Sequence, residues 1–309
     1  MEGHKAVSCS LRISRDDDGR RLDRILRGTF KSVTLGEIMK AVRKGAVLVN
    51  GVRVKDGSFH VSEGDELTAP WQKGEVIIPK HTGWGKISVI FHGENILILN
   101  KPANILVQPD TPNGNSIITR VWGVLGTRTP AAVHRLDRNT TGVLAVALHG
   151  DSLRALEELF KARRVRKIYL AVVSGKLPDE VTVDAPLLKD SINNTVKVSA
   201  DGVKAATKIT CLDSDGQYSL ARIELLTGRT HQARVHSAHI GHPIIGDRKY
   251  GDFSANRTAK SISRPLLHAY ELGFPYDVDE ALAEIAGKNF NAELPSDMKE
   301  FIDSRGLKI

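Results

Sequence analysis

The first hydrophobic pattern of the chain predicts two short helices and a hairpin. Residues 21–30 and 34–44 carry apolar side chains at helical spacing, with basic residues on the opposite side. Thr34 is expected to be the N-cap of the second helix, and Gly45 is expected to end it. Valines then alternate on both sides of Asn50-Gly51, a sequence typical of a tight β-hairpin turn.

From residue 87 onward, most apolar runs have the length and the flanking turns of buried strands. These runs cover residues 87–91, 96–99, 143–148, 168–173, 204–211, 218–226 and 266–272. Asp151 is expected to cap a helix, and a short terminal helix is expected after Pro295. Turns rather than regular helices separate most of the runs, so we predict an α+β fold. Its sheet would be mixed and largely antiparallel, not part of an alternating βαβ fold.

These patterns divide the chain into four segments. Residues 1–18 are predicted to be a polar arm, and residues 19–70 a small α/β domain. Residues 71–86 are rich in proline and glycine and are predicted to be a linker. Residues 87–309 are long enough to bury the core of a larger second domain.

Positive charge is concentrated near the start of the chain. The protein has 44 basic and 36 acidic residues, for a formal charge of +8. Residues 20–55 alone hold ten basic and two acidic side chains, and the rest of the chain is balanced. A solvated face without a partner is one explanation, but a basic face confined to one short segment favours nucleic acid. The candidate nucleic-acid-binding residues are Arg21, Arg24, Lys31, Arg43, Lys44, Arg53 and Lys55.

Other features of the composition limit the protein class. Cys9 and Cys211 are too few for a disulfide framework or a cysteine zinc site. No apolar run reaches the length of a membrane helix, and no secretory signal is visible at the start. We therefore expect a cytoplasmic protein with no membrane contact.

The most informative motif is the run His134-Arg-Leu-Asp-Arg-Asn-Thr-Thr-Gly-Val-Leu144, which places a carboxylate between two arginines. Asp137 would lie on a loop before a buried strand, where reactive groups often occur. A nearby guanidinium keeps a carboxylate ionised, so Asp137 could act as a nucleophile without an activating base. A structural ion pair between Asp137 and an arginine is the alternative.

Four histidines near residue 240 raise the question of a metal site: His231, His236, His239 and His242. Three of them could share one side of a helix, a geometry compatible with zinc. Arg229 and Arg234 argue against this, because two fixed cations would repel a third. We predict no metal and expect the histidines to form hydrogen bonds or to face RNA.

Four sequence patterns together resemble the RluA family of RNA pseudouridine synthases. Residues 134–142 match H-R-L-D-x-x-T-S-G, and residues 228–236 match G-R-T-H-Q-[IL]-R-V-H. G-H-P-I-x-G-D follows at residues 241–247, and residues 166–175 are similar to K-x-Y-x-A-x-V-x-G. The resemblance covers roughly residues 86–300. The N-terminal pattern is similar to the αL-type RNA-binding domain first known from a ribosomal small-subunit protein, and to the N-terminal domain of the RluC and RluD branch.

The resemblance implies an isomerase that converts specific uridines to pseudouridine without a cofactor, with large-subunit (23S) ribosomal RNA as the expected substrate. It implies that Asp137 attacks either the ribose C1′ or the ring C6, and the sequence does not choose between these routes. Tyr169 would stack on the extruded base, and Arg234 would pair with the aspartate. Arg135 would fill the space left by the flipped nucleotide or contact its phosphate. Leu226 is expected to line the base pocket.

The chain departs from the family pattern at several positions that bear on loop shape. Thr141 replaces the commoner serine, and Ala233 replaces isoleucine or leucine.

Lys101, in an N-K-P motif at a strand end, could have either a structural or a functional role. A non-catalytic RNA-binding ribosome-assembly factor with the same fold is the alternative function, and a metal-dependent hydrolase is a third. Nothing in the sequence requires more than a monomer.

Overall fold

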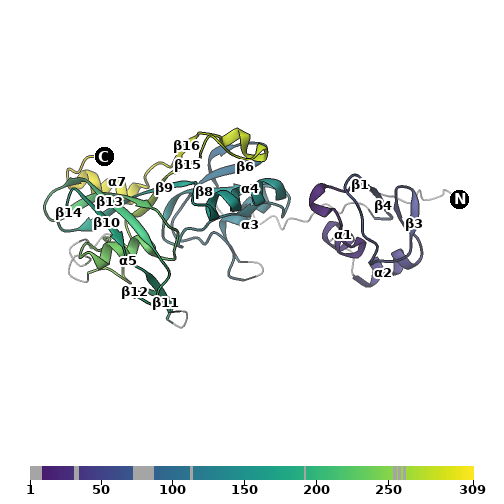
Figure 1. Ribbon diagram of the computed structural model, residues 1–309, viewed down its shortest axis with the longest axis horizontal. Helices are drawn as coiled ribbons and strands as arrows, with labels where there is room; N and C mark the ends of the chain where they lie inside the picture. Colours follow the sequence, from purple (N-terminus) through teal and green to yellow (C-terminus); the bar gives the residue numbers. More distant parts are fainter. Residues whose placement is uncertain are drawn as a thin grey trace. The chain divides into compact units, whose positions relative to one another are not determined.

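The computed structural model describes residues 9–30, 35–71, 87–111, 114–190, 193–252, 256, 259 and 262–309 (Figure 1). These residues form two compact units, one extending to Trp71 and one holding nearly all described residues from Ile87 onward. The predicted N-cap Thr34, the candidate RNA-binding Lys31 and residues 72–86 of the predicted linker lie outside the described residues.

The N-terminal unit packs two helices on a four-stranded antiparallel sheet with the order β1-β4-β2-β3. Its elements are β1 (Cys9–Arg12), a 3-10 turn (Arg15–Asp17), α1 (Leu22–Thr29), α2 (Leu35–Arg43), β2 (Val47–Val49), β3 (Val52–Val54) and β4 (Glu66–Ala69). The helix positions picked out by hydrophobic spacing, among them Leu22, Leu26, Phe30 and Ile38, form the core with Val47 and Leu67. The predicted small α/β domain is therefore confirmed. Asn50 and Gly51 both have positive φ, as the hairpin turn requires.

The prediction of a polar arm over residues 1–18 was wrong from Cys9 onward. Residues 9–12 form β1, which pairs with β4 in the register Cys9 to Ala69 and Arg12 to Glu66. Ser10 Oγ also donates to Glu66 Oε1 at 2.9 Å. A largely polar segment can form an edge strand because backbone hydrogen bonds attach it to the sheet, and here Leu11 also packs against the core of the unit.

The large unit is built on a ten-stranded sheet whose main path runs β10-β13-β14-β9-β15-β8-β6-β5. The strands of that path are β5 (Ser88–His92), β6 (Ile96–Lys101), β8 (Thr141–Ala147), β9 (Arg166–Ser174), β10 (Glu180–Asp184), β13 (Ala206–Ser214), β14 (Tyr218–Leu225) and β15 (Leu267–Gly273). Beside it, β7 (Ala131–Ala132) pairs with β8, and β16 (Asn289–Asn291) pairs with β15. The pair β15–β8 is parallel and the other pairs along the path are antiparallel, which confirms the predicted mixed, largely antiparallel sheet.

Helices cover both faces of this sheet (Figure 1). The helical elements are α3 (Ile117–Leu125), α4 (Gly150–Lys161), α5 (Gln232–His239), the 3-10 helix η2 (Glu280–Ile285) and α7 (Ser296–Ser304). Ala221 of β14 packs in one cluster with Ala233 of α5, and Leu220 packs in another with Met298 of α7. Neighbouring residues of a strand point to opposite faces, so α5 and α7 cover opposite sides of β14.

Two smaller features complete the unit. A separate hairpin of β11 (Leu187–Asp190) and β12 (Thr195–Val198) lies beside α5 (Figure 1). The helix expected to start at an Asp151 cap starts at Gly150 instead, with His149 as its N-cap. None of the helices in the described ranges has the length and apolar character needed to cross a membrane.

The junction of β8 with β15 determines how the 134–144 motif enters the sheet. Gly142 lies opposite Ala269 in the parallel register, with φ of 114°. A Cβ at this position would lie 2.0 Å from the carbonyl oxygen of Ala269, so the close approach of the two backbones requires glycine. Beside it, Thr141 Oγ1 lies 2.8 Å from His268 Nδ1, and His268 Nε2 lies 3.2 Å from the carbonyl oxygen of Ala292.

This buried His268 is expected to make the large unit sensitive to acid. Burial lowers the pKa of His268 to about 4, so the unfolded chain binds more protons than the folded one between pH 6.5 and pH 4. The stabilising contribution of the neutral ring is therefore complete above pH 6.5 and is lost as the pH falls toward 4. It amounts to about 3 kcal/mol.

A His268→Gln variant cannot be protonated, so its urea midpoint should fall less between pH 7 and pH 4.5 than that of the wild type. Comparing the two proteins removes the contribution of carboxylates, which they share. An equal fall in both proteins would show that His268 contributes nothing to acid sensitivity.

Candidate active site

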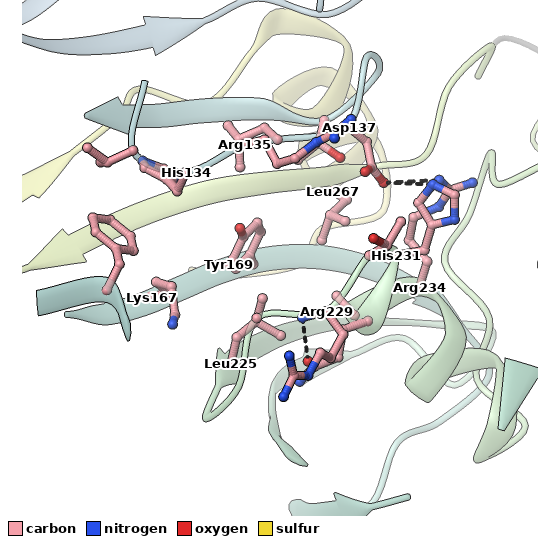
Figure 2. A pocket seen from close by; sticks show the side chains of 18 of the residues that line it. His134, Arg135, Asp137, Lys167, Tyr169, Leu225, Arg229, His231, Arg234 and Leu267 are labelled. Atoms are coloured by element: carbon pink, nitrogen blue, oxygen red, sulfur yellow. Dashed lines mark hydrogen bonds and ion pairs between the residues drawn. The ribbon is translucent and has the colours of Figure 1, made fainter. Parts of the chain in front are cut away.

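A cavity of about 550 Å³ opens in the large unit and collects the motifs predicted from the sequence. Its walls come from the loop before β8, from β9, and from the segment joining β14 to α5. Figure 2 shows Asp137 pointing toward Arg234 and His231, with Tyr169 and Leu225 farther along the same cavity. The side chains that line the cavity include His134, Arg135, Asp137, Lys167, Tyr169, Leu225, Arg229, His231, Arg234 and Leu267.

The loop that carries Asp137 is held through three consecutive backbone carbonyls. The Thr140 N–H donates to the carbonyl of Asp137 itself at 3.1 Å. Lys101 Nζ donates to the carbonyl of Arg138 at 3.0 Å, and Arg264 Nη1 donates to the carbonyl of Asn139 at 3.3 Å. Lys101 is fully buried, and burial lowers its pKa to about 7. Lys101 thus holds the Asp137 loop through a buried hydrogen bond, which supports a structural role.

His134 supports the other side of the same loop as a neutral ring. Its Nε2 accepts a hydrogen bond from the backbone N–H of Ala145 at 3.0 Å, and the ring stacks on Phe160 with 4.7 Å between centroids. Burial lowers the pKa of His134 to about 3, with a smaller effect from Lys167. A neutral acceptor here links the motif directly to β8.

Asp137 forms a charge-assisted hydrogen bond with Arg234 across 97 residues of sequence. Arg234 Nη1 donates to Asp137 Oδ2 at 3.1 Å. The same guanidinium donates from Nε and Nη2 to both oxygens of Asp247, at 2.7 and 2.8 Å. Asp247 is 1% exposed and Asp137 is 28% exposed on their side chains. The buried carboxylate thus fixes the guanidinium, and the guanidinium presents one nitrogen to the accessible carboxylate.

The charged forms of Asp137, Arg234 and Asp247 stabilise one another. Burial alone would raise the pKa of Asp247, but hydrogen bonds from Arg234 outweigh it and keep that pKa below its ordinary value. Burial opposes the charge on Arg234 as well, yet both carboxylates together raise its pKa above the ordinary value. Arg234 therefore stays charged, with its guanidinium 5.0 Å from the centre of the Tyr250 ring.

Tyr169 and Leu225 present an aromatic and an apolar surface to the same cavity. Burial raises the pKa of the Tyr169 phenol, and the charge of Asp137 raises it further, so the phenol is neutral at physiological pH. The prediction that Leu226 lines the cavity was wrong. Leu226 is 43% exposed, and the lining residue is its neighbour Leu225. An error of one residue along a strand selects the opposite face of the sheet.

Gln232 organises the loop that delivers Arg234, a role that the sequence analysis missed. Its Oε1 accepts from Thr227 Oγ1 at 2.7 Å and from the Arg229 N–H at 3.0 Å. Its Nε2 donates to the carbonyl of Ala206 and to Thr207 Oγ1. A side chain that is 1% exposed and makes four hydrogen bonds ties the loop to β13. Its place in the G-R-T-H-Q motif was the only available signal.

The histidines near residue 240 are dispersed rather than gathered. His236 is buried, with Nδ1 2.8 Å from Thr207 Oγ1 and Nε2 3.0 Å from the carbonyl of Ala185. His242 Nδ1 lies 2.8 Å from the carbonyl of Ser174. Among the residues that the structure describes, no three His, Cys, Asp or Glu side chains are placed to hold a metal ion.

The remaining predicted residues fall into two groups. Arg135 is exposed and lines the cavity. In the N-terminal unit, the described candidates for RNA binding are all exposed: Arg21, Arg24, Arg43, Lys44, Arg53 and Lys55. Arg21 pairs with Asp23 at 2.8 Å. The side chains of Arg53 and Lys55 both lie next to Gly45, where a Cβ would meet each of them at 3.5 Å.

Comparisons with known proteins find a matching family model for each of the two units. The family model described as RNA pseudouridylate synthase matches residues 95–239, and the model of the S4 domain matches residues 20–67. A protein named ribosomal large subunit pseudouridine synthase C from Vibrio vulnificus is 32% identical, covering 94% of this chain and 95% of its own length. A protein of the same name from Escherichia coli is 34% identical, covering 85% and 88%.

A solved structure also supports the assignment to the pseudouridine synthases. The human protein titled RNA Pseudouridylate Synthase Domain Containing 4 is 25% identical, with a TM-score of 0.59 over 77% of this chain and 98% of that one. Relatives above 30% identity span nearly the whole chain, and the two family models match its two units. The chain therefore belongs to the RluA family of RNA pseudouridine synthases, which are isomerases, and carries an N-terminal S4 domain.

Proposed function

We propose that this enzyme converts specific uridines of large-subunit (23S) ribosomal RNA to pseudouridine, with Asp137 as the nucleophile. The observation that carries the proposal is the position of Asp137, which is accessible in the cavity while Arg234 holds its Oδ2 at 3.1 Å. Such a carboxylate is charged, is held in one orientation, and can act as a nucleophile without an activating base.

In the proposed reaction the target uridine first leaves its stack and enters the cavity, because its sugar–base bond is otherwise out of reach. Asp137 then attacks at the ribose C1′ or at C6 of the ring. The bond between N1 and C1′ breaks, the uracil turns within the cavity, and C5 bonds to C1′. The bond to the Asp137 oxygen breaks as C5 bonds to C1′ if it was made at C1′, or afterwards if it was made at C6, which returns the carboxylate. The proton on C5 then leaves, and the nitrogen released from the sugar gains one proton. Uridine and pseudouridine are isomers, so the atoms balance without an oxidant or a co-reactant.

The other cavity residues suit an extruded nucleotide. Tyr169 offers a neutral aromatic face, and stacking on such a face is worth about 1–3 kcal/mol per base. Leu225 supplies an apolar contact on β14. Arg135, exposed at the cavity, can contact the phosphate beside the target or occupy the space that the base has left. The cavity walls keep the detached uracil close to the sugar that it must rejoin.

The choice of ribosomal RNA rests on the relatives and on the N-terminal unit. The relatives from Vibrio vulnificus and Escherichia coli are named as large-subunit pseudouridine synthases. The S4 domain of this chain carries the basic segment at residues 20–55, whose positive charge attracts a phosphate backbone. We also propose that the enzyme acts as a monomer in the cytoplasm, where ribosomal RNA is found.

Mapping pseudouridines across ribosomal and transfer RNA tests the substrate. Cells lacking this protein should lose pseudouridine at defined positions of 23S RNA, and the gene on a plasmid should restore them. Loss confined to transfer RNA or small-subunit RNA would overturn the choice of substrate. An unchanged map would favour the alternative of a non-catalytic assembly factor.

Neutralising the cluster of Arg43, Lys44, Arg53 and Lys55 with glutamine is expected to weaken RNA binding without altering the chemical step. Each phosphate that the variant no longer neutralises should reduce the slope of log K against log salt by about 1. Titration of a 23S RNA fragment at several salt concentrations measures this slope. Substituting the exposed Lys299 and Lys308 of the large unit with glutamine provides the control. An unchanged slope in the four-residue variant would exclude this cluster as an RNA-binding surface.

A further inference from the structure

His231 has a backbone conformation that requires explanation. It is the N-cap of α5, with φ of 55° and ψ of 17°, in the left-handed region that few residues other than glycine, asparagine, aspartate and histidine adopt. Such strain persists only when the surrounding structure enforces it, and it is concentrated at functional sites. The conformation places the His231 ring in the wall of the cavity, beside Asp137 (Figure 2).

The two ring nitrogens of His231 face different partners. Nδ1 lies 2.7 Å from the hydroxyl of Tyr250, and Nε2 lies 3.7 Å from Oδ2 of Asp137. Arg234 contacts that same oxygen at 3.1 Å. Both contacts therefore fall on Oδ2. Within the described ranges, no hydrogen bond or ion pair is found at Oδ1 of Asp137.

The tautomer of His231 is set by the direction of its hydrogen bond with Tyr250. The Tyr250 hydroxyl accepts the backbone N–H of Val196, in β12, at 2.9 Å. Its hydrogen can point at Nδ1 of His231, and in that arrangement Nδ1 accepts. Burial lowers the pKa of His231 despite the nearby Asp137, so the ring is neutral at pH 7. A neutral ring whose Nδ1 accepts must carry its hydrogen on Nε2, the nitrogen that faces the aspartate.

We propose that His231 is a positioning residue for the nucleophile, held by Tyr250 as the Nε2–H tautomer and aimed at Oδ2 of Asp137. This inference rests on the proposed role of Asp137. With Arg234 and His231 both directed at Oδ2, Oδ1 is the oxygen that attacks the nucleotide. A distance of 3.7 Å in the free enzyme becomes a hydrogen bond once substrate fills the cavity, since catalytic hydrogen bonds often tighten on binding.

His231→Asn is the sharpest variant for testing this role. Asparagine tolerates the left-handed backbone and keeps a polar atom near the position of Nδ1, but it lacks a donor at the position of Nε2. We expect kcat to fall about tenfold to a hundredfold while KM for RNA and the urea midpoint stay close to wild type. His231→Gln, whose amide nitrogen reaches the position of Nε2, should recover part of kcat.

Nitrogen-15 spectra of histidine-labelled enzyme test the tautomer independently of activity. His231, assigned by its loss in His231→Asn, should show the proton on Nε2, and Tyr250→Phe should lose that preference. Proton attachment at Nδ1 in the wild type, or full kcat in His231→Asn, would overturn the proposal. If instead the wild type itself formed no pseudouridine, the proposed function would fail and not this inference alone.

Discussion

Asp137→Asn is expected to fold normally and to lose pseudouridine formation by roughly 10³-fold or more, a loss typical of removing a nucleophile. The amide has nearly the shape of the carboxylate but does not attack carbon at neutral pH. Folding should be spared because Arg234 keeps its two hydrogen bonds to Asp247 in the variant. Tritium release from RNA labelled at C5 of uridine, measured under single-turnover conditions, reports the loss directly.

Asp110→Asn is the matched control for this substitution. Asp110 is a carboxylate that is 61% exposed and pairs with Arg138, the residue after Asp137, at 3.5 Å. Its replacement changes the net charge of the enzyme equally but removes no group from the cavity. Near-normal release in Asp110→Asn together with no release in Asp137→Asn would isolate the nucleophile. Substantial release in Asp137→Asn would remove Asp137 from that role.

Much of the architecture was accessible from local sequence. The helical spacing of Leu22, Leu26 and Ile38 identified the two helices of the N-terminal unit, because each helix buries one face. The strand after residue 142 was recognisable because β8 is buried along its whole length. The meeting of Asp137 with Arg234 could not come from spacing, and it was anticipated only through resemblance to a family whose motifs hold both residues.

What could not be predicted depends on pairing between distant segments. The strand at Cys9–Arg12 has only a weak hydrophobic pattern, with Leu11 packed against the core, and it forms because β4, more than fifty residues later, pairs with its backbone. The choice of Leu225 over Leu226 follows from the register of β14 against β9 and β13, which no single strand encodes. The anchoring of Arg234 by Asp247 likewise requires the fold to bring α5 against the following loop.

Gly142→Ala is expected to have the largest effect on stability. The new Cβ would lie 2.0 Å from the carbonyl oxygen and 2.7 Å from the nitrogen of Ala269, both backbone atoms of β15 that cannot rotate away. To accommodate it, the parallel pair β8–β15 must separate at the centre of the sheet. We expect a loss of about 4 kcal/mol in the free energy of unfolding, or failure to accumulate as soluble protein. Urea unfolding followed by tryptophan fluorescence and circular dichroism measures the loss.

Gly216→Ala is the control that distinguishes the cost of the steric clash from the cost of the positive φ. Gly216 has φ of 88°, also in the positive region, but a Cβ there would meet no atom within 4 Å. Its substitution should therefore cost only the strain of a left-handed alanine, about 1 kcal/mol. If both variants were destabilised equally, the need for glycine at 142 would lie in its φ alone. The larger loss expected in Gly142→Ala would show that the close approach of β8 and β15 requires glycine. That contact in turn places the Asp137 loop at the edge of the cavity.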